Sequence, residues 1–246
     1  MPVLVGTAGW SIDGSVAASF NGEGTSLQRY ASVFPIVEVN SSFHRPHRET
    51  TWQRWRDAVP AHFRFSAKMP KTVSHGQRLI DCEGLLDVFL GQVRGLGEKL
   101  AILLLQLPPR LEFDPGATQR FFGVLRSRSA TQIVLEPRHQ SWFGDEADAL
   151  LRAAHVARVA ADPARHPNGG APGGWRGLSY FRLHGSPVIY RSSYADRIDA
   201  YAEKLRGESA EGRPTWCIFD NTASSGAIND ALASWALAAP GRAAQE

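Results

Sequence analysis

The chain has 246 residues, which is enough for one large domain or two small ones. Hydrophobic residues make up 43% of it and charged residues 21%, a balance typical of a packed globular protein rather than a disordered one. The net charge of +3 is too small to indicate a nucleic-acid-binding protein by itself, and no apolar run approaches the roughly 20 residues that span a bilayer. The first ten residues lack a basic, apolar leader and the two cysteines form no CxxC pattern, so we expect a cytoplasmic protein without a membrane partner.

Eight short apolar or alternating runs predict β-strands along the chain. They lie at 3–8, 36–41, 63–68, 100–107, 132–137, 156–162, 179–185 and 215–221. Amphipathic helical patterns fill most of the intervals, and the first of these helices has Ser26 as its expected N-cap. A mean strand spacing of roughly 30 residues matches a chain of this length divided into eight β/α units.

Alternating strands and helices predict a parallel sheet. Eight units favour a single-domain (β/α)8 TIM-like barrel over residues 1–240, followed by a C-terminal tail at 241–246. A doubly wound open sheet is the alternative, but the GxGxxG loop that it favours is absent. The sixth unit departs from the pattern, because residues 163–177 are rich in Pro and Gly. We expect a loop there in place of a regular helix, and we favour a passive loop over a lid.

Polar side chains recur on one face of the predicted strands, close to their C-terminal ends. Side chains alternate between the two faces of a strand, so Glu38 shares a face with Asn40 and lies opposite Val37 and Val39. The other polar residues in comparable positions are Lys68, Gln106, Glu136, Arg138, Asp162, Arg182, His184, Asp220 and Asn221. Because the active sites of (β/α)8 barrels lie at the C-terminal ends of the strands, we expect these side chains to gather there.

The same motifs resemble those of the DUF72 (YecE-like) family. The matching stretches are GTAGW (6–10), YASVFPIVEVNSSFHRP (30–46), FRFSAKMPKTVSH (63–75), LLLQLPP (103–109), LEPRHQSW (135–142), YFRLHG (180–185) and FDNTASSGAINDA (219–231), with Tyr190 and Tyr194 between the last two. Two positions differ: Phe43-His44-Arg45 replaces the common FYR pattern, and Asp220-Asn221 replaces two asparagines. The resemblance implies a TIM barrel with a polar mouth. It supplies no substrate, since the biochemical role of the family is not established.

The first functional hypothesis is an enzyme that performs acid–base chemistry on a small anionic substrate, such as a phosphate or a carboxylate. Glu136 is the first choice for the essential carboxylate, and Glu38, His184 and Asp162 complete the expected catalytic set. The residues expected to bind or enclose the substrate are Arg138, Arg182, Lys68, Asn40, Gln106, Trp10, Phe43, His139, Asn221, Tyr190 and Trp142. Hydrolase, lyase and isomerase chemistry all stay open, and no cofactor is predicted.

Three alternatives remain beside this hypothesis. A metal-dependent hydrolase or isomerase could draw its ligands from Glu38, Glu136, Asp162, His139, His184 and Asp220, although HxH and HExxH spacings are absent and the nearby cations would repel a metal ion. A nucleic-acid-binding protein or nuclease could use the basic loop at 186–197, where Tyr190 and Tyr194 are placed to stack on bases. A buried ion network without chemistry would explain the same residues. The oligomeric state stays open.

Overall fold

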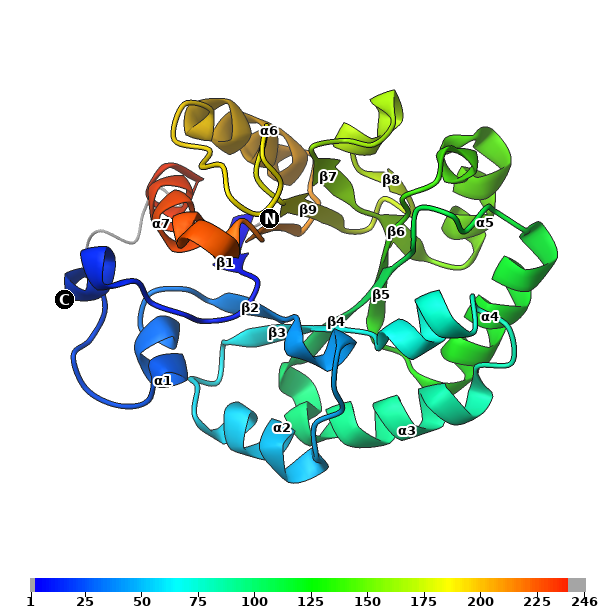
Figure 1. The fold of residues 1–246 in the computed structure, drawn as a ribbon, viewed down its shortest axis with the longest axis horizontal. Helices are drawn as coiled ribbons and strands as arrows, with labels where there is room; N and C mark the ends of the chain where they lie inside the picture. The colour runs from blue at the N-terminus through cyan, green and yellow to red at the C-terminus, as the bar shows by residue number, and fades with distance from the viewer. Residues whose placement is uncertain (1–2, 239–246) are drawn as a thin grey trace.

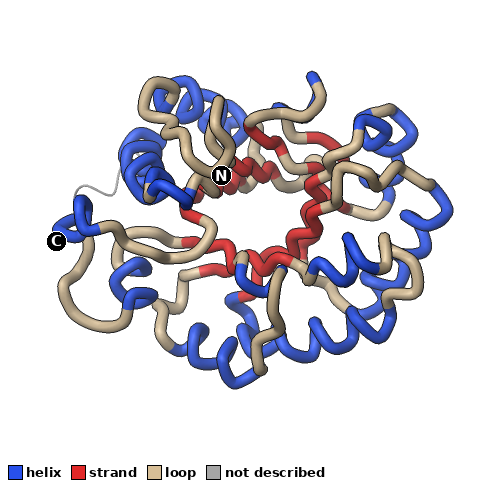
Figure 2. Tube along the Cα trace, in the orientation of Figure 1, coloured by secondary structure: helices blue, strands red, loops and turns tan. Residues whose placement is uncertain are grey.

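The computed structural model describes residues 3–238. The chain has a mixed α/β fold in which parallel strands lie around a common centre and the helices lie outside them (Figure 2). The strands are β1 (Val3–Thr7), β2 (Ile36–Val39), β3 (Arg64–Lys68), β4 (Leu100–Gln106), β5 (Gln132–Glu136), β6 (Val156–Arg158), β7 (Ala160–Asp162), β8 (Gly173–Gly174), β9 (Ser179–Leu183) and β10 (Thr215–Phe219). The expected tail at 241–246 lies outside the described residues.

The α-helices follow the strands in alternation (Figure 1). They are α1 (Ser26–Ala31), α2 (Glu49–Asp57), α3 (Glu83–Val93), α4 (Pro115–Arg128), α5 (Asp145–Ala153), α6 (Ile198–Ala210) and α7 (Gly226–Ala238). The N-cap of α1 is Thr25 rather than the predicted Ser26. The Thr25 side chain accepts from Gln28 N, and the Gln28 side chain accepts from Thr25 N at 2.8 Å, a reciprocal capping box that Ser26 cannot form one residue later. Among residues 3–238, no helix is long and apolar enough to cross a membrane.

Strand pairing divides the strands into two sheets, with the orders β1-β10-β9-β7 and β2-β3-β4-β5-β6-β8. All pairs are parallel except β6–β8. The sheets confirm the predicted α/β class with parallel strands. The closed barrel stays a prediction, because within residues 3–238 no continuous ladder joins the two sheets.

The sheets adjoin at β1 and β2, where the Tyr30 side chain reaches between the two strands. Its hydroxyl accepts a hydrogen bond from Thr7 N at 2.8 Å and donates one to Ile36 O at 3.0 Å. Beyond this point the backbones of the two segments pair directly, at one isolated parallel bridge between Ala8 and Glu38. A side-chain hydroxyl therefore satisfies the backbone groups that a longer ladder would otherwise have paired.

The sheets also meet where the predicted strand 156–162 is divided at Val159. Its first half, β6, pairs with β5, and its second half, β7, pairs with β9. The described chain between β7 and β9 contains no α-helix, as expected for the sixth unit. The segment is more ordered than a plain loop, however, because it forms a 3-10 helix at Pro167–Gly170 and the strand β8, which pairs antiparallel with β6.

The inner faces of the strands change from apolar to polar along their length. The inner apolar cluster consists of Ile36, Ile102, Leu104, Val134, Ala157, Val159, Leu178, Tyr180, Trp216 and Ile218. Two residues further along five of these strands stand the buried polar residues Glu38, Gln106, Glu136, Arg182 and Asp220. The two-residue period of a strand places each polar side chain on the same face as its apolar predecessor, one step closer to the C-terminal end. The polar residues therefore form a layer above the apolar one.

Candidate functional site

Arg182, on β9, is the centre of the polar layer. Its side chain is fully buried and contacts carboxylates from three other strands. Nη2 donates to Glu38 Oε1 at 2.7 Å and to Asp220 Oδ2 at 2.9 Å, Nε donates to Glu38 Oε2 at 3.0 Å, and Nη1 donates to Glu136 Oε2. We call Glu38, Glu136, Arg182, His184 and Asp220 the strand-end cluster.

His184 joins two of these carboxylates. Its Nδ1 lies 2.9 Å from Asp220 Oδ2 and its Nε2 lies 3.1 Å from Glu136 Oε1. Burial opposes the charged imidazolium and Arg182 repels it, but the negative charge of Glu136 and the hydrogen bonds to Asp220 and Glu136 raise the pKa of His184 above its usual value. When protonated, the ring donates from both nitrogens, and each donor has a carboxylate acceptor.

Glu136, at the end of β5, accepts hydrogen bonds from three basic residues. Besides Arg182 and His184, Arg138 donates to Glu136 Oε1 from Nε at 3.0 Å and from Nη2 at 2.8 Å. Burial alone would raise the pKa of Glu136, but the positive charges of Arg182, His184 and Arg138 hold that pKa well below its ordinary value. Glu136 is therefore a weak base, and three basic side chains are held against it.

Lys68, at the end of β3, differs from the other basic residues of this layer. Only 6% of the residue is exposed, yet among the described residues its ammonium makes no hydrogen bond or ion pair. Its Nζ lies 4.3 Å from the centre of the Phe43 ring. Burial, and then the positive charge of Arg182, lower the pKa of Lys68 to about 8, against the opposing effect of Glu38, Asp220 and Glu136.

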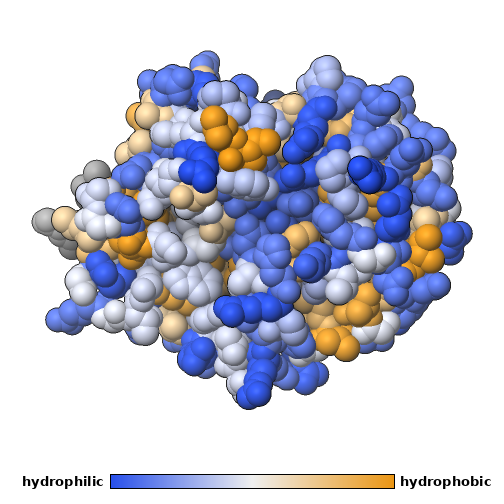
Figure 3. All heavy atoms as spheres, in the orientation of Figure 1, coloured by the Kyte–Doolittle hydropathy of each residue, from blue (hydrophilic) through white to orange (hydrophobic). Residues whose placement is uncertain are grey.

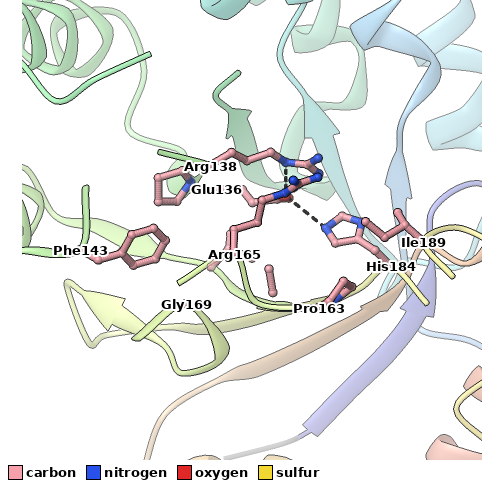
Figure 4. Close-up of a pocket in the computed structure, with 11 residues that line it drawn as sticks. Glu136, Arg138, Phe143, Pro163, Arg165, Gly169, His184 and Ile189 are labelled. Atoms are coloured by element: carbon pink, nitrogen blue, oxygen red, sulfur yellow. Dashed lines mark hydrogen bonds and ion pairs between the residues drawn. The ribbon is translucent and has the colours of Figure 1, made fainter. Parts of the chain in front are cut away.

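A small, partly open cavity lies beside the strand-end cluster. It is lined by Glu136, Arg138 and His184 together with Arg165, Phe143 and apolar residues from the ends of β5, β7 and β9. Figure 4 shows Arg165, which comes from the segment after β7, extending toward Arg138 and Glu136. Within the described chain, Arg165 has no carboxylate partner. Hydrophilic residues gather around the centre of the molecular face shown in Figure 3.

Several other predicted residues also belong to this region. Gln106 accepts from Arg182 Nη1 at 3.4 Å, and Asn40 donates to Asp220 Oδ1 at 3.1 Å. Tyr190 is partly exposed and packs edge-on against His184, with 5.8 Å between ring centroids. Phe43 contacts Lys68 and lies 5.2 Å from the His75 ring. Together with the strand-end cluster, these residues form one continuous site.

Five predicted residues take their contacts elsewhere, and their expected roles stay untested. Asn221 donates to Asp230 on α7, Asp162 faces Arg197, His139 caps the turn at Ser141, Trp10 packs on Trp55, and Trp142 is buried with its indole donating to Leu111 O. Two of the ligands suggested for a metal, Asp162 and His139, therefore lie apart from the other four, which surround Arg182. Among residues 3–238, no group of three or more His, Cys, Asp or Glu side chains is arranged to hold a metal ion.

Sequence reasoning missed four residues of the site. Tyr180 donates to Glu38 Oε2 at 2.9 Å and to Ser66 Oγ at 3.0 Å in the fully buried centre. The sequence could have revealed Tyr180 and Ser66. Tyr180 lies two residues before Arg182, and Ser66 lies two residues before Lys68, so each shares a strand face with a predicted site residue. Arg165 and Phe143 gave no periodic signal, because they lie outside the strands.

We expect the stabilising effect of His184 to depend on pH. Because the folded-state pKa is raised, the contribution is fully present below the unfolded pKa of about 6.5 and is lost as pH rises through the folded pKa. The free energy of unfolding of His184→Gln should therefore lie below that of the wild type by about 1–3 kcal/mol at pH 6, and the gap should narrow with increasing pH. Urea denaturation from pH 6 to 9 measures the gap, and a gap that widens or stays constant contradicts the assignment.

Comparison with known protein families supports a relationship over nearly the whole chain. Residues 4–245 match the family described as "Protein of unknown function DUF72". UPF0759 protein YecE of Escherichia coli strain K12 is 33% identical over 144 residues, which cover 56% of this chain and 52% of that protein. UPF0759 protein YunF of Bacillus subtilis strain 168 is 26% identical over 147 residues, covering 57% and 52%. The chain thus spans about half the length of the curated relatives it matches.

Solved structures show the same fold. A DUF72 family protein from Enterococcus faecalis superposes with a TM-score of 0.80 at 20% identity, covering 96% of this chain and 95% of that one. Another from Thermotoga maritima gives 0.77 at 23% identity, covering 95% and 98%. None of these descriptions names a substrate or a reaction.

Proposed function

The chain belongs to the DUF72 family of unknown function, and from that starting point we propose that it is an enzyme that performs acid–base chemistry on a small anionic substrate. The reaction would take place at the C-terminal ends of the strands, beside the strand-end cluster. The observation that carries this proposal is positive charge that no carboxylate neutralises: Arg165 lines the cavity, and Lys68 lies at the end of β3 in the polar layer. Hydrolase, lyase and isomerase chemistry are all compatible with it.

The charge excess follows from the pairing within the site. The three carboxylates of the strand-end cluster are held by Arg182, His184 and Arg138, which leaves Lys68 and Arg165 without an acidic partner among the described residues. The positive charges of this region also act on His75. Its pKa is lowered by burial and then by the charges of Lys68, Arg138 and Lys71. Guanidinium groups bind phosphates and carboxylates through paired hydrogen bonds, so an anion is the ligand that suits this surface.

Proton transfer requires a group with a pKa near the working pH. Lys68, with a pKa of about 8, meets this condition, whereas Glu136, with its strongly lowered pKa, does not. We therefore assign proton transfer to Lys68, assisted by His184, whose pKa is raised. Glu38 and Glu136 take the role of holding Arg182, His184 and Arg138 in place.

We also propose that the two sheets form one (β/α)8 barrel and that residues 1–240 are a single domain. The bridge from Ala8 to Glu38 and the hydroxyl of Tyr30 support closure at one junction, and the unbroken chain through Val159 supports it at the other. One apolar cluster includes residues from Val3 to Ala238, which supports a single domain.

Arg165 offers a direct test of anion binding, because it contacts the cavity without supporting the buried network. A thermal-shift screen of small phosphorylated and carboxylated compounds should identify ligands that stabilise the wild type. Arg165→Gln should weaken their binding about tenfold or more in calorimetric titration, the loss expected for one charge-assisted hydrogen bond. Arg54→Gln removes the same charge from the exposed side of α2 and should change the Kd less than twofold.

Three results would contradict the proposal. Equal weakening by Arg165→Gln and Arg54→Gln would indicate a general charge effect rather than a site. A protein that no anion stabilises, but that binds single-stranded DNA with strong salt dependence, would favour the nucleic-acid alternative. About one equivalent of a single divalent metal in protein purified without chelators would favour metal-assisted chemistry.

A further inference from the structure

We propose that Lys68 is a nucleophile of this site and forms an imine with the carbonyl carbon of an anionic aldehyde or ketone. The proposal rests on the function proposed above and deepens it by naming the substrate class. It also gives Lys68 a covalent role in addition to proton transfer.

No carboxylate pairs with the Lys68 ammonium among the described residues, and the ammonium contacts the face of the Phe43 ring. The carboxylates near it already have donors: Glu38 accepts from Arg182 and Tyr180, Glu136 from Arg182 and Arg138, and Asp220 from Arg182. A buried lysine normally forms an ion pair that offsets the loss of hydration. Here the Lys68 side chain is largely buried, and among the described residues its amine makes no hydrogen bond or ion pair. The amine nitrogen is still not completely shielded, so it keeps an opening to the solvent.

The surroundings of the amine lower its pKa. Lysines become nucleophilic when burial removes water from them or when another cation lies close by. Lys68 has both, since it is almost fully buried and the positive charge of Arg182 disfavours its own, whereas the face of the Phe43 ring, 4.3 Å from Nζ, favours that charge. The other charged groups that act on it are Glu38 from β2, Glu136 from β5 and Asp220 after β10, which favour the charge. His75, from the turn Thr72–Gly76, has its ring 5.2 Å from the Phe43 ring. The balance of burial and these charges leaves a substantial fraction of the Lys68 amine neutral near pH 8.

An acceptor without a donor lies at the end of the neighbouring strand. Asn40 directly follows Val39, which pairs in register with Ala67, the residue before Lys68. Asn40 uses its amide nitrogen on Asp220, and its Oδ1 is enclosed without a partner among the described residues. An enclosed acceptor of this kind is costly unless a donor fills it, and the N–H or O–H of an addition intermediate would do so.

The chemistry balances without an oxidant or a reductant. The lone pair of the neutral Lys68 amine forms a C–N bond while the π bond of the carbonyl breaks, which gives a carbinolamine. The C–O bond then breaks, and the carbonyl oxygen leaves as water with the two protons that were on the amine nitrogen. The resulting imine, once protonated, withdraws electrons from the adjacent carbon and makes its proton acidic.

The position of the anion-binding residues narrows the substrate class. Lys68 belongs to β3, whereas the cavity that contains Arg165 and Arg138 lies at the ends of β5, β7 and β9. A substrate that reaches both has its phosphate or carboxylate group separated from the carbonyl carbon by several bonds.

The chain offers a clean labelling experiment, because its only lysines are Lys68, Lys71, Lys99 and Lys204. The protein is treated with pyridoxal 5′-phosphate at pH 7.5, reduced with sodium borohydride, digested and mapped by mass spectrometry. About a quarter of an amine with a pKa near 8 is neutral at this pH, against roughly one in a thousand for an ordinary lysine. We expect Lys68 to be labelled about tenfold faster than Lys71 and Lys204, with a rate that rises with pH through about 8; the α-amino group is resolved in its own peptide.

The outcomes separate this proposal from the anion-binding function. Labelling of Lys68 no faster than that of Lys71 overturns the imine proposal, even if anions still bind in an Arg165-dependent way. Fast labelling by pyridoxal 5′-phosphate and by pyridoxal alike, unaffected by Arg165→Gln, supports the nucleophile but contradicts the anionic substrate. If Lys68 reacts faster with pyridoxal 5′-phosphate than with pyridoxal, and Arg165→Gln abolishes this difference, both the nucleophile and the anionic substrate are supported. Lys68→Arg, which keeps the charge, should leave no fast-reacting lysine in the digest.

Discussion

Replacing Arg182 by Met is expected to lower the free energy of unfolding by about 3–5 kcal/mol at pH 7, because it leaves charged partners buried without their counter-ion. Glu38, Glu136 and Asp220 all direct carboxylate oxygens at this one guanidinium, which is fully buried. Met fills a similar volume, so the loss reports on charge rather than on a cavity. Urea denaturation followed by tryptophan fluorescence measures it.

The dependence of this loss on pH identifies its cause. Arg182 lowers the pKa of Glu136 and Asp220 in the wild type, whereas burial without Arg182 raises it. The carboxyl groups of the variant should therefore take up protons as pH falls from 7 to 5, and the difference from the wild type should shrink. A variant that fails to fold at pH 7 but folds at pH 5 also shows that unpaired buried carboxylates cause the loss of stability.

Arg128→Met is the matched control. Arg128 makes an ion pair with Asp87 at 2.7 Å, but Asp87 is largely exposed, so the variant should lose no more than about 1 kcal/mol and show no such dependence on pH. If Arg182→Met loses as little as Arg128→Met, or if its loss is the same at pH 5 and pH 7, the cluster does not depend on buried charge pairing.

The sequence predicted the centre of the site well because two simple rules determine it. The two-residue period of a strand fixes which side chains share a face, and parallel strands bring their C-terminal ends together. Glu38, Glu136, Arg182 and His184 follow both rules, and the structure brings them within hydrogen-bonding distance. Tyr180 follows the same rules, two residues before Arg182, but was not among the predicted site residues.

The predictions diverged from the structure where the strand geometry ends or changes. Asp162 was expected to share the inner face, but Val159 and Ala161 line the cavity, so Asp162 points outward to Arg197. Asn221 lies beyond the end of β10, where the backbone turns, and its amide reaches Asp230 on α7. Arg165 is positioned by an irregular segment, for which periodicity gives no prediction. The interruption between β1 and β2 depends on the Tyr30 hydroxyl, a contact between distant parts of the chain that no local pattern reveals.

Glu136→Gln is expected to impair the site more than the fold. Gln keeps the shape of the side chain but removes the charge that holds Arg138 and most strongly raises the pKa of His184. We expect the pKa of His184 to fall, which an NMR titration of its ring proton would show. Turnover of any substrate found by the anion screen should fall about 10²-fold, the lower range for a lost acid–base contribution, because His184 loses the charge that raises its pKa. The free energy of unfolding should fall by about 1.5–3 kcal/mol.

Glu208→Gln provides the comparison that separates these effects. Glu208 is also a partly buried carboxylate, bound by Arg176, Arg213 and Ser179, but Ser179 stands at the opposite end of β9 from His184. Its replacement should destabilise the protein by a similar amount and leave both the His184 titration and turnover unchanged. If the two variants behave alike, Glu136 only stabilises the fold and the buried ion network needs no catalytic explanation. If only Glu136→Gln alters His184 and turnover, the network exists to set the protonation and position of the groups that face the substrate.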